Sequence, residues 1–269
     1  MGIIVFTFLL TGLASGFVAG LLGVGGGIII VPVTYFVLLK LGYPSEVVMH
    51  VAIASSLGVI CFTSISSIRS HLKLKNTNIS IVKKWAFGIA IGSILGSFSA
   101  SLISGENLVI IFVILAFLIS INMLLQQQPI LLNTDLPSSK LVNFSISSVI
   151  GFFSSIIGIG GGSFSVPTLT MFSKKIHEAV GTSAVFGFLI AFPGAITFIL
   201  TGLRKEGLPF YSIGYVNILI VLIISLTSVF TAGYGARISK NIDKLVLRKI
   251  FAIFLLLTCV SLIIEHFII

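Results

Sequence analysis

Ten apolar runs account for most of this 269-residue chain, and they decide in which solvent it can fold. Eight of them are long enough to cross a hydrocarbon layer of about 30 Å as a helix. The runs fall at about 2–22, 28–41, 46–68, 85–104, 107–125, 141–157, 163–173, 178–201, 212–236 and 245–268. Only 9% of the residues are charged, against about 25% in soluble domains, so the chain could not cover its own surface in water. Because a backbone in lipid must satisfy its own hydrogen bonds, we predict an all-α polytopic membrane protein with every run helical.

The order of the runs repeats after the fifth, and the two halves share a pattern of glycine and proline. The glycine-rich segment 23–27 precedes Pro32 at the same distance at which segment 158–162 precedes Pro167. Chance similarity between apolar stretches does not account for clustered glycines with a proline at a fixed offset. We therefore predict a first membrane repeat at 1–125, a linker at 126–140 and a second membrane repeat at 141–269.

The basic residues indicate how the two repeats are oriented. If each repeat crosses the membrane an odd number of times, 13 of the 16 Lys and Arg residues share one side, and Lys40, Arg204 and Lys205 lie on the other. If the two short runs do not cross, the split becomes 8 to 8, so the positive-inside rule favours the first case. Two repeats that each cross the membrane an odd number of times and follow one another in the chain have opposite orientations, which is the inverted repeat common in secondary transporters. Both termini would then face outward. The count leaves open whether the short runs 28–41 and 163–173 cross completely.

Each glycine-rich segment lies between a long run and a short one, where we expect a turn followed by a helix start. Such a turn exposes backbone N–H groups, and the helix dipole adds about half a positive charge. No Lys or Arg lies deep within a run, so we predict that these turns bind a small anion; the alternative is that glycine only permits a sharp turn or close packing. The predicted binding residues are the glycines, their prolines and nearby hydroxyl residues: Gly23, Gly25, Gly26, Gly27, Pro32, Ser55, Ser56, Gly158, Gly160, Gly161, Gly162, Ser163, Pro167, Thr182 and Ser183.

Other chemistry has little support in the sequence. His50 and His177 hold equivalent places in the two repeats and could couple gating to protons, although a histidine at a helix end is more often structural. All seven carboxylates fall near run ends or in loops, so we expect no catalytic residues, no metal site and no cofactor. The glycine clusters lack the spacing of a dinucleotide-binding turn. The net charge of +9 comes from basic loop residues and does not indicate nucleic acid as a partner.

Two further patterns concern helix packing and anchoring. Gly12, Gly16 and Gly20 form one row of small residues at a spacing of four, and residues 88–96 contain another. Such rows let helix backbones approach closely in lipid. Trp85 follows two lysines, which predicts an indole anchored at the membrane surface.

The doubled motif GFVAGLLGVGGGIIIVP at 16–32 and GFFSSIIGIGGGSFSVP at 151–167 resembles the TauE/SafE family of sulfite and organosulfonate exporters. Weaker matches are AVGTSA at 179–184, GYVN at 214–217 and GARIS at 235–239. The resemblance implies a multi-pass permease of the bacterial inner membrane that exports small oxyanions such as sulfite or sulfoacetate. It also implies about eight spans, which the chain reaches if each glycine-hinged pair counts as one broken helix. AIASSL at 52–57 departs from the second repeat's GTS, so the two repeats need not bind equally.

Two transport functions fit these patterns. The first is a secondary transporter with alternating access around the glycine turns, and the alternative is an anion or small-solute channel lined by the same turns. A membrane module that transports nothing fits less well, because the repeat covers nearly the whole chain. The expected partners are a small anionic substrate and membrane lipid, with a homo-oligomer left open.

Overall fold

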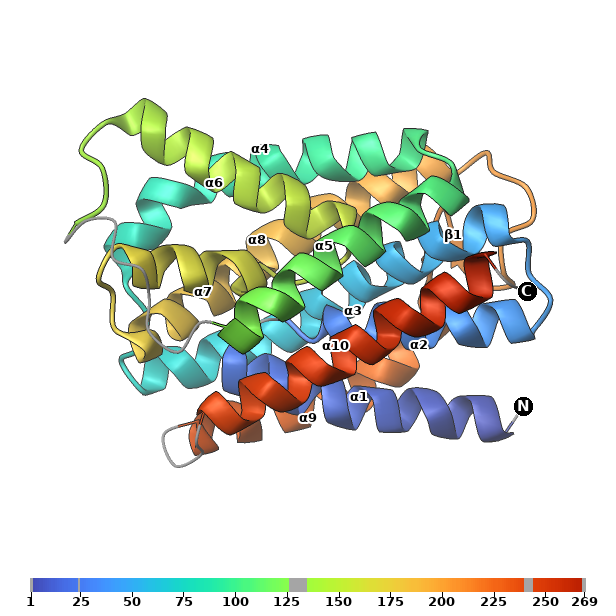
Figure 1. Cartoon of the computed structure of the whole chain (residues 1–269), viewed down its shortest axis with the longest axis horizontal. Coiled ribbons are helices and arrows are strands. Elements are labelled where there is room, and N and C mark those ends of the chain that lie inside the picture. The colour runs from blue at the N-terminus through green and yellow to red at the C-terminus, as the bar shows by residue number, and fades with distance from the viewer. Residues whose placement is uncertain (1, 24, 126–134, 240–243, 268–269) are drawn as a thin grey trace.

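The computed structural model describes residues 2–23, 25–125, 135–239 and 244–267, and in this part of the chain it confirms the predicted all-helical class. Figure 1 shows the helices side by side along the long axis, with both termini at one end of the molecule. The helices are α1 (Gly2–Leu22), α2 (Gly27–Lys40), α3 (Ser45–Lys73), α4 (Ile79–Leu102), α5 (Gly105–Leu125), α6 (Lys140–Ile156), α7 (Gly162–Met171), α8 (Ile176–Gly202), α9 (Ile218–Ile238) and α10 (Lys244–Phe267). Most of the linker predicted at 126–140 lies outside the described residues.

Six helices of the described residues are long and apolar enough to cross a membrane: α1, α3, α4, α5, α8 and α9. The two runs predicted to be short form α2 and α7, with 14 and 10 residues. α6 has 17 residues, the same length as the run predicted at 141–157, and it is one of the shorter apolar helices of the described residues. The chain is therefore a multi-pass membrane protein with short helices at the predicted places in both halves.

One predicted helix starts later than expected. The run at 212–236 opens as a small antiparallel hairpin of β1 (Ser212–Ile213) and β2 (Val216–Asn217), and α9 begins only at Ile218. Asn217 sets this start, because its side-chain oxygen accepts a hydrogen bond from the N–H of Ile220 at 3.0 Å. Asn78 starts α4 in the same way through the N–H of Ile81.

The two repeats do not form separate bundles. α1 packs along α9, and α6 packs along α4, so the first helix of each repeat lies against the fourth helix of the other. α3 packs against α8, and α5 against α10. In Figure 1, α1 runs away from the end that holds the termini, whereas α6 runs toward it. An inverted arrangement requires these directions, and the pseudo-two-fold relation itself stays a prediction.

The rows of small residues form the contacts between these exchanged helices. A Cβ atom on Gly20 would lie 2.7 Å from the carbonyl carbon of Ala232 in α9. On α4, a Cβ atom on Gly92 would lie 2.7 Å from the carbonyl carbon of Ser148 in α6. The absence of side chains is therefore what allows both helix pairs to approach so closely, as the spacing predicted.

The prediction of a surface anchor at Trp85 is wrong. The indole is fully buried, its Nε1 donates a hydrogen bond to Oδ1 of Asn143 at 2.9 Å, and its ring stacks on Phe186. The reason is that α4 begins at Ile79, so Trp85 lies well inside the helix on its packed face. Asn143 of α6 supplies the acceptor that a buried indole needs.

The basic turns gather at one end of the molecule. The turns from α3 to α4 and from α7 to α8 carry Lys75 and Lys174, and both lie at the end opposite the termini (Figure 1). The turn after α8 carries Arg204 and Lys205 and lies at the end of the termini. The loops thus carry unequal charge at the two ends, as the sequence count required.

Candidate functional site

The two glycine turns meet in the interior of the protein. A Cβ atom on Gly25 would lie 2.6 Å from Cα of Gly160, so the two backbones cross in direct contact. A Cβ atom on Gly27 would lie 2.9 Å from Cα of Ile159. Segments that are far apart in the sequence, one from each repeat, are therefore in direct contact.

The glycines of the two turns are needed for different reasons. In the first turn, Gly23, Gly25 and Gly26 have φ values of 70°, 81° and 75°, which residues with a side chain rarely adopt. In the second turn only Gly158 has a positive φ, at 65°. Gly161 has an ordinary φ of −55°, but a Cβ atom there would lie 2.8 Å from Cδ1 of Ile190. Sharp turning and close packing thus explain part of the glycine pattern.

A short helix starts directly after each turn, and neither start has a side-chain cap. Gly26 precedes α2 and Gly161 precedes α7, and each of their carbonyl oxygens accepts two N–H groups from the first helical turn. For the N–H groups of Gly27 and Gly162, the described residues provide no acceptor. Buried amides without a partner are costly, so the lack of an acceptor in this part of the chain makes these two groups the polar atoms of the turns that a function has to explain.

The hydroxyl groups near the turns have mixed roles. Oγ of Ser55 accepts the N–H of Asn217, and Oγ1 of Thr182 accepts the N–H of Asn78, each at 3.0 Å. These two residues, equivalent in the two repeats, thus hold the starts of α9 and α4. Neither asparagine was predicted from the sequence, although Asn is a preferred residue immediately before a helix.

Two other serines hold the turns in place. Ser56 donates a hydrogen bond to the carbonyl oxygen of Gly158 at 2.7 Å, which ties α3 to the second turn. Ser183 donates to the carbonyl oxygen of Ala179 and accepts from Ser165 at 2.7 Å. Among the hydroxyl residues predicted for the site, Ser163 differs, because its buried Oγ has no hydrogen-bond partner in the described residues. It lies in the first turn of α7, next to the free amide of Gly162.

Pro32 and Pro167 lie inside α2 and α7 and not in the turns themselves, each five residues after the last glycine of its turn. A proline has no N–H, so it leaves the carbonyl oxygen four residues earlier, on Ile28 or Ser163, without its usual helical donor. Each proline therefore frees a polar group in the first turn of its short helix.

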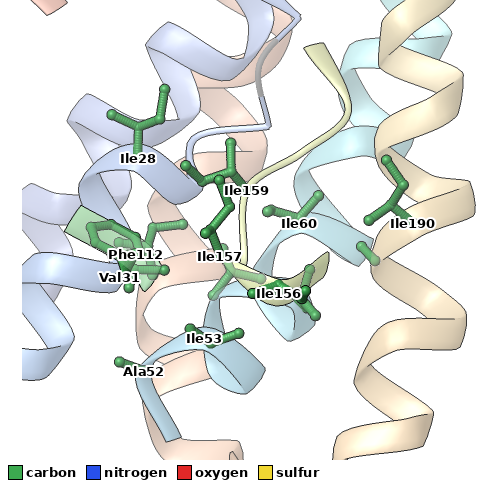
Figure 2. Packing of buried hydrophobic residues seen from close by; sticks show 14 of the residues in the cluster. Ile28, Val31, Ala52, Ile53, Ile60, Phe112, Ile156, Ile157, Ile159 and Ile190 are labelled. Atoms are coloured by element: carbon green, nitrogen blue, oxygen red, sulfur yellow. The ribbon is translucent and has the colours of Figure 1, made fainter. Parts of the chain in front are cut away.

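Isoleucine side chains close the site in this conformation. Figure 2 shows Ile53, Ile60 and Ile159 crowded around the turns, with Ile190 of α8 facing them. The glycines described in both turns are buried. The meeting point of the turns is therefore buried inside the helices in this structure.

The two candidate gating histidines have different environments. His50 is buried near the start of α3, where its Nε2 lies 3.0 Å from the carbonyl oxygen of Ile103 and its ring stacks on Tyr215. His177 begins α8 at the opposite end and lines a pocket with Lys75 and Glu178. The two residues lie at opposite ends as expected, and the proton-gating role stays a prediction. No group of metal-binding side chains occurs among the described residues.

Comparison with known proteins identifies the family. The family model described as Sulfite exporter TauE/SafE matches residues 8–262, which is nearly the whole chain. The chain belongs to this family of membrane transporters. The predicted resemblance is thereby confirmed, and in this TauE/SafE chain the two motif copies are the segments that meet in the interior.

Several relatives are also named as transporters. A probable membrane transporter protein of Haemophilus influenzae is 33% identical, over 95% of this chain and 98% of its own. The probable membrane transporter protein YunE of Bacillus subtilis is 29% identical, over 94% of this chain and 95% of its own. A relative of the same description from Methanocaldococcus jannaschii is 31% identical, over 87% of this chain and 86% of its own. No solved structure matches this TauE/SafE chain.

Proposed function

We propose that this chain is a secondary transporter that exports a small oxyanion, such as sulfite or an organosulfonate. The anion binds between the two glycine turns, where it accepts hydrogen bonds from the N–H groups of Gly27 and Gly162 and from the hydroxyl of Ser163. The observation that carries this proposal is the contact between Gly25 and Gly160, which brings two uncapped helix starts together in the interior. The family model's description supports sulfite as the substrate.

The positive potential at the turns is suited to a small anion that must bind during transport and then be released. Each helix start contributes about half a positive charge, and the low dielectric of the interior strengthens its attraction for an anion. A buried lysine or arginine would hold an anion more tightly and would be costly in the membrane. Backbone dipoles provide attraction without a fixed charge, so the substrate can be released when the site opens.

The sealed conformation supports a carrier over a channel. A solute can enter only if the backbones of Gly25 and Gly160 separate, and the isoleucines around them must move with the helices. Because α1 and α6 pack on helices of the other repeat, a shift of one repeat changes the packing of both, which fits a rocking motion between two access states. The end with the basic turns would face the cytoplasm of the bacterial inner membrane.

The test is thermal stabilisation of the purified protein by a panel of anions. Sulfite, sulfoacetate and chloride are compared at equal ionic strength, with unfolding followed by the fluorescence of Trp85, the one tryptophan of the chain. A ligand at 100 times its Kd stabilises the folded form by about 2.7 kcal/mol, so a substrate should raise Tm by several degrees. If none of the oxyanions raises Tm above the chloride value, the proposed site is wrong. Saturation of flux in liposomes then separates a carrier from a channel.

A further inference from the structure

A groove between α3 and α9 combines apolar walls with a cationic end, away from the glycine turns. Its volume is about 770 Å³. Phe62, Ile65 and Phe230 line the apolar part, and Phe230 is 76% exposed. Arg69, Lys73 and Arg237 line the other part. In Figure 1 the last turns of α3 and α9 lie at the end opposite the termini, so the cations lie at one surface of the membrane-spanning body.

The floor of the groove lies at Gly233, whose missing side chain lets α9 approach the serines of α3. A Cβ atom on this residue would lie 3.2 Å from Oγ of Ser66 and 3.5 Å from Oγ of Ser70. Ser66 spans the gap between the two helices, because it donates a hydrogen bond to the carbonyl oxygen of Val229 on α9 at 2.7 Å. Gly233, Ser66 and Ser70 therefore form a close-packed floor, and an acyl chain would lie above it, between the exposed side chains that line the groove.

Among the described residues, the cationic end has no counter-charge. None of the described lining residues is a carboxylate, and the ion pair found in this part of the chain joins Lys174 to Asp135. Arg69, Lys73 and Arg237 are all exposed, so their positive charges reinforce one another in the space that they share. A negatively charged group bound there would relieve this repulsion.

We propose that this groove binds one anionic phospholipid, with an acyl chain over Phe62 and Phe230 and the phosphate between Arg69 and Arg237. Phe62 and Lys73 are 11 positions apart on α3, a rise of about 16 Å. This is close to half of a hydrocarbon layer of about 30 Å, so the groove has the depth of a single leaflet. Basic pockets between helices at a membrane surface are typical sites for anionic headgroups.

Other occupants fit less well. A free small anion would use only the cationic end and would leave the apolar part exposed to lipid tails. A second copy of the chain on a two-fold axis would bring the same cations against one another. The lipid assignment rests on this groove alone, and it does not depend on which substrate the protein transports.

The experiment measures thermal stabilisation of the detergent-purified full chain by three probes: phosphatidylglycerol, phosphatidylcholine and glycerol 3-phosphate. We expect only phosphatidylglycerol to raise Tm at equal concentration, because it alone has both acyl chains and a net negative charge. The variant Arg69→Gln/Arg237→Gln should bind phosphatidylglycerol roughly 25-fold more weakly, since each of the two basic groups contributes about a factor of five at such a surface. The variant Arg204→Gln/Lys205→Gln removes the same charge at the opposite end and should bind as the wild type does.

A second variant tests the apolar part with the charges intact. Gly233→Leu fills the floor of the groove and should abolish stabilisation by phosphatidylglycerol. Two results would overturn the proposal: equal stabilisation by phosphatidylcholine, or full stabilisation of both Arg69→Gln/Arg237→Gln and Gly233→Leu. Stabilisation by glycerol 3-phosphate alone would show a small-anion site in place of a lipid site.

Discussion

Replacing Gly20 by valine should lower the Tm of the protein by roughly 10 °C, because the new side chain has no space against α9. A Cβ atom there would lie 2.7 Å from the carbonyl carbon of Ala232 and 2.8 Å from the backbone nitrogen of Ala236. Backbone atoms cannot rotate away, so α1 and α9 must separate and lose their packing. The fluorescence of the buried Trp85 during heating reports the transition.

Gly2→Val is the matched control for this variant. Gly2 belongs to the same helix, and a Cβ atom there has no other atom within 4 Å. The control should therefore unfold within a few degrees of the wild type. An unchanged Tm for Gly20→Val would show that α1 and α9 do not pack as described. It would also contradict the packing of each repeat's first helix on the fourth helix of the other repeat.

Replacing Gly26 by alanine should reduce anion flux into liposomes at least tenfold per folded molecule. The φ of 75° costs an alanine about 1–2 kcal/mol, and the new Cβ atom would lie 2.6 Å from the carbonyl oxygen of Ser15. To relieve this contact the turn must shift, and the N–H groups at the start of α2 then lose their position at the site. Flux is normalised to the folded fraction, which the fluorescence of Trp85 provides.

Gly207→Ala separates backbone strain from the effect on the site. Gly207 has almost the same φ, 74°, but it lies in an exposed loop after α8, and the nearest atom to its added Cβ is Cγ of Pro44 at 3.3 Å. This variant carries a similar conformational penalty and should keep its flux within about twofold of the wild type. Equal losses in both variants would mean that general strain, and not the first turn, limits transport.

The hydropathy of the sequence predicts the order and the type of the helices well, because the membrane leaves few alternatives for a long apolar run. It fails where apolar residues adopt another local structure. The hairpin formed by Ser212, Ile213 and Val216 lies in the same apolar run as the helix that follows it, so hydropathy does not separate the two. Only the capping by Asn217 marks the true beginning of α9, and a search for capping residues could have found it.

The sequence could identify equivalent glycines but not their contacts. The repeat pairs Gly25 with Gly160, yet it does not say that the two residues touch, because an internal repeat reports similarity of sequence and not proximity. The burial of Trp85 has the same cause, since its partner Asn143 belongs to the other repeat. Contacts between residues of different repeats can be identified only in the three-dimensional structure.

Amide hydrogen exchange on the wild-type protein tests the proposed anion site most directly. The amides of Gly27 and Gly162 have no acceptor among the described residues, so they should exchange whenever the site opens, and a bound oxyanion should slow this exchange. We expect sulfite to protect peptides covering residues 25–30 and 160–165 together, while peptides from the turn after α8 stay unchanged. Protection that is absent from both turns at a saturating sulfite concentration would contradict the account.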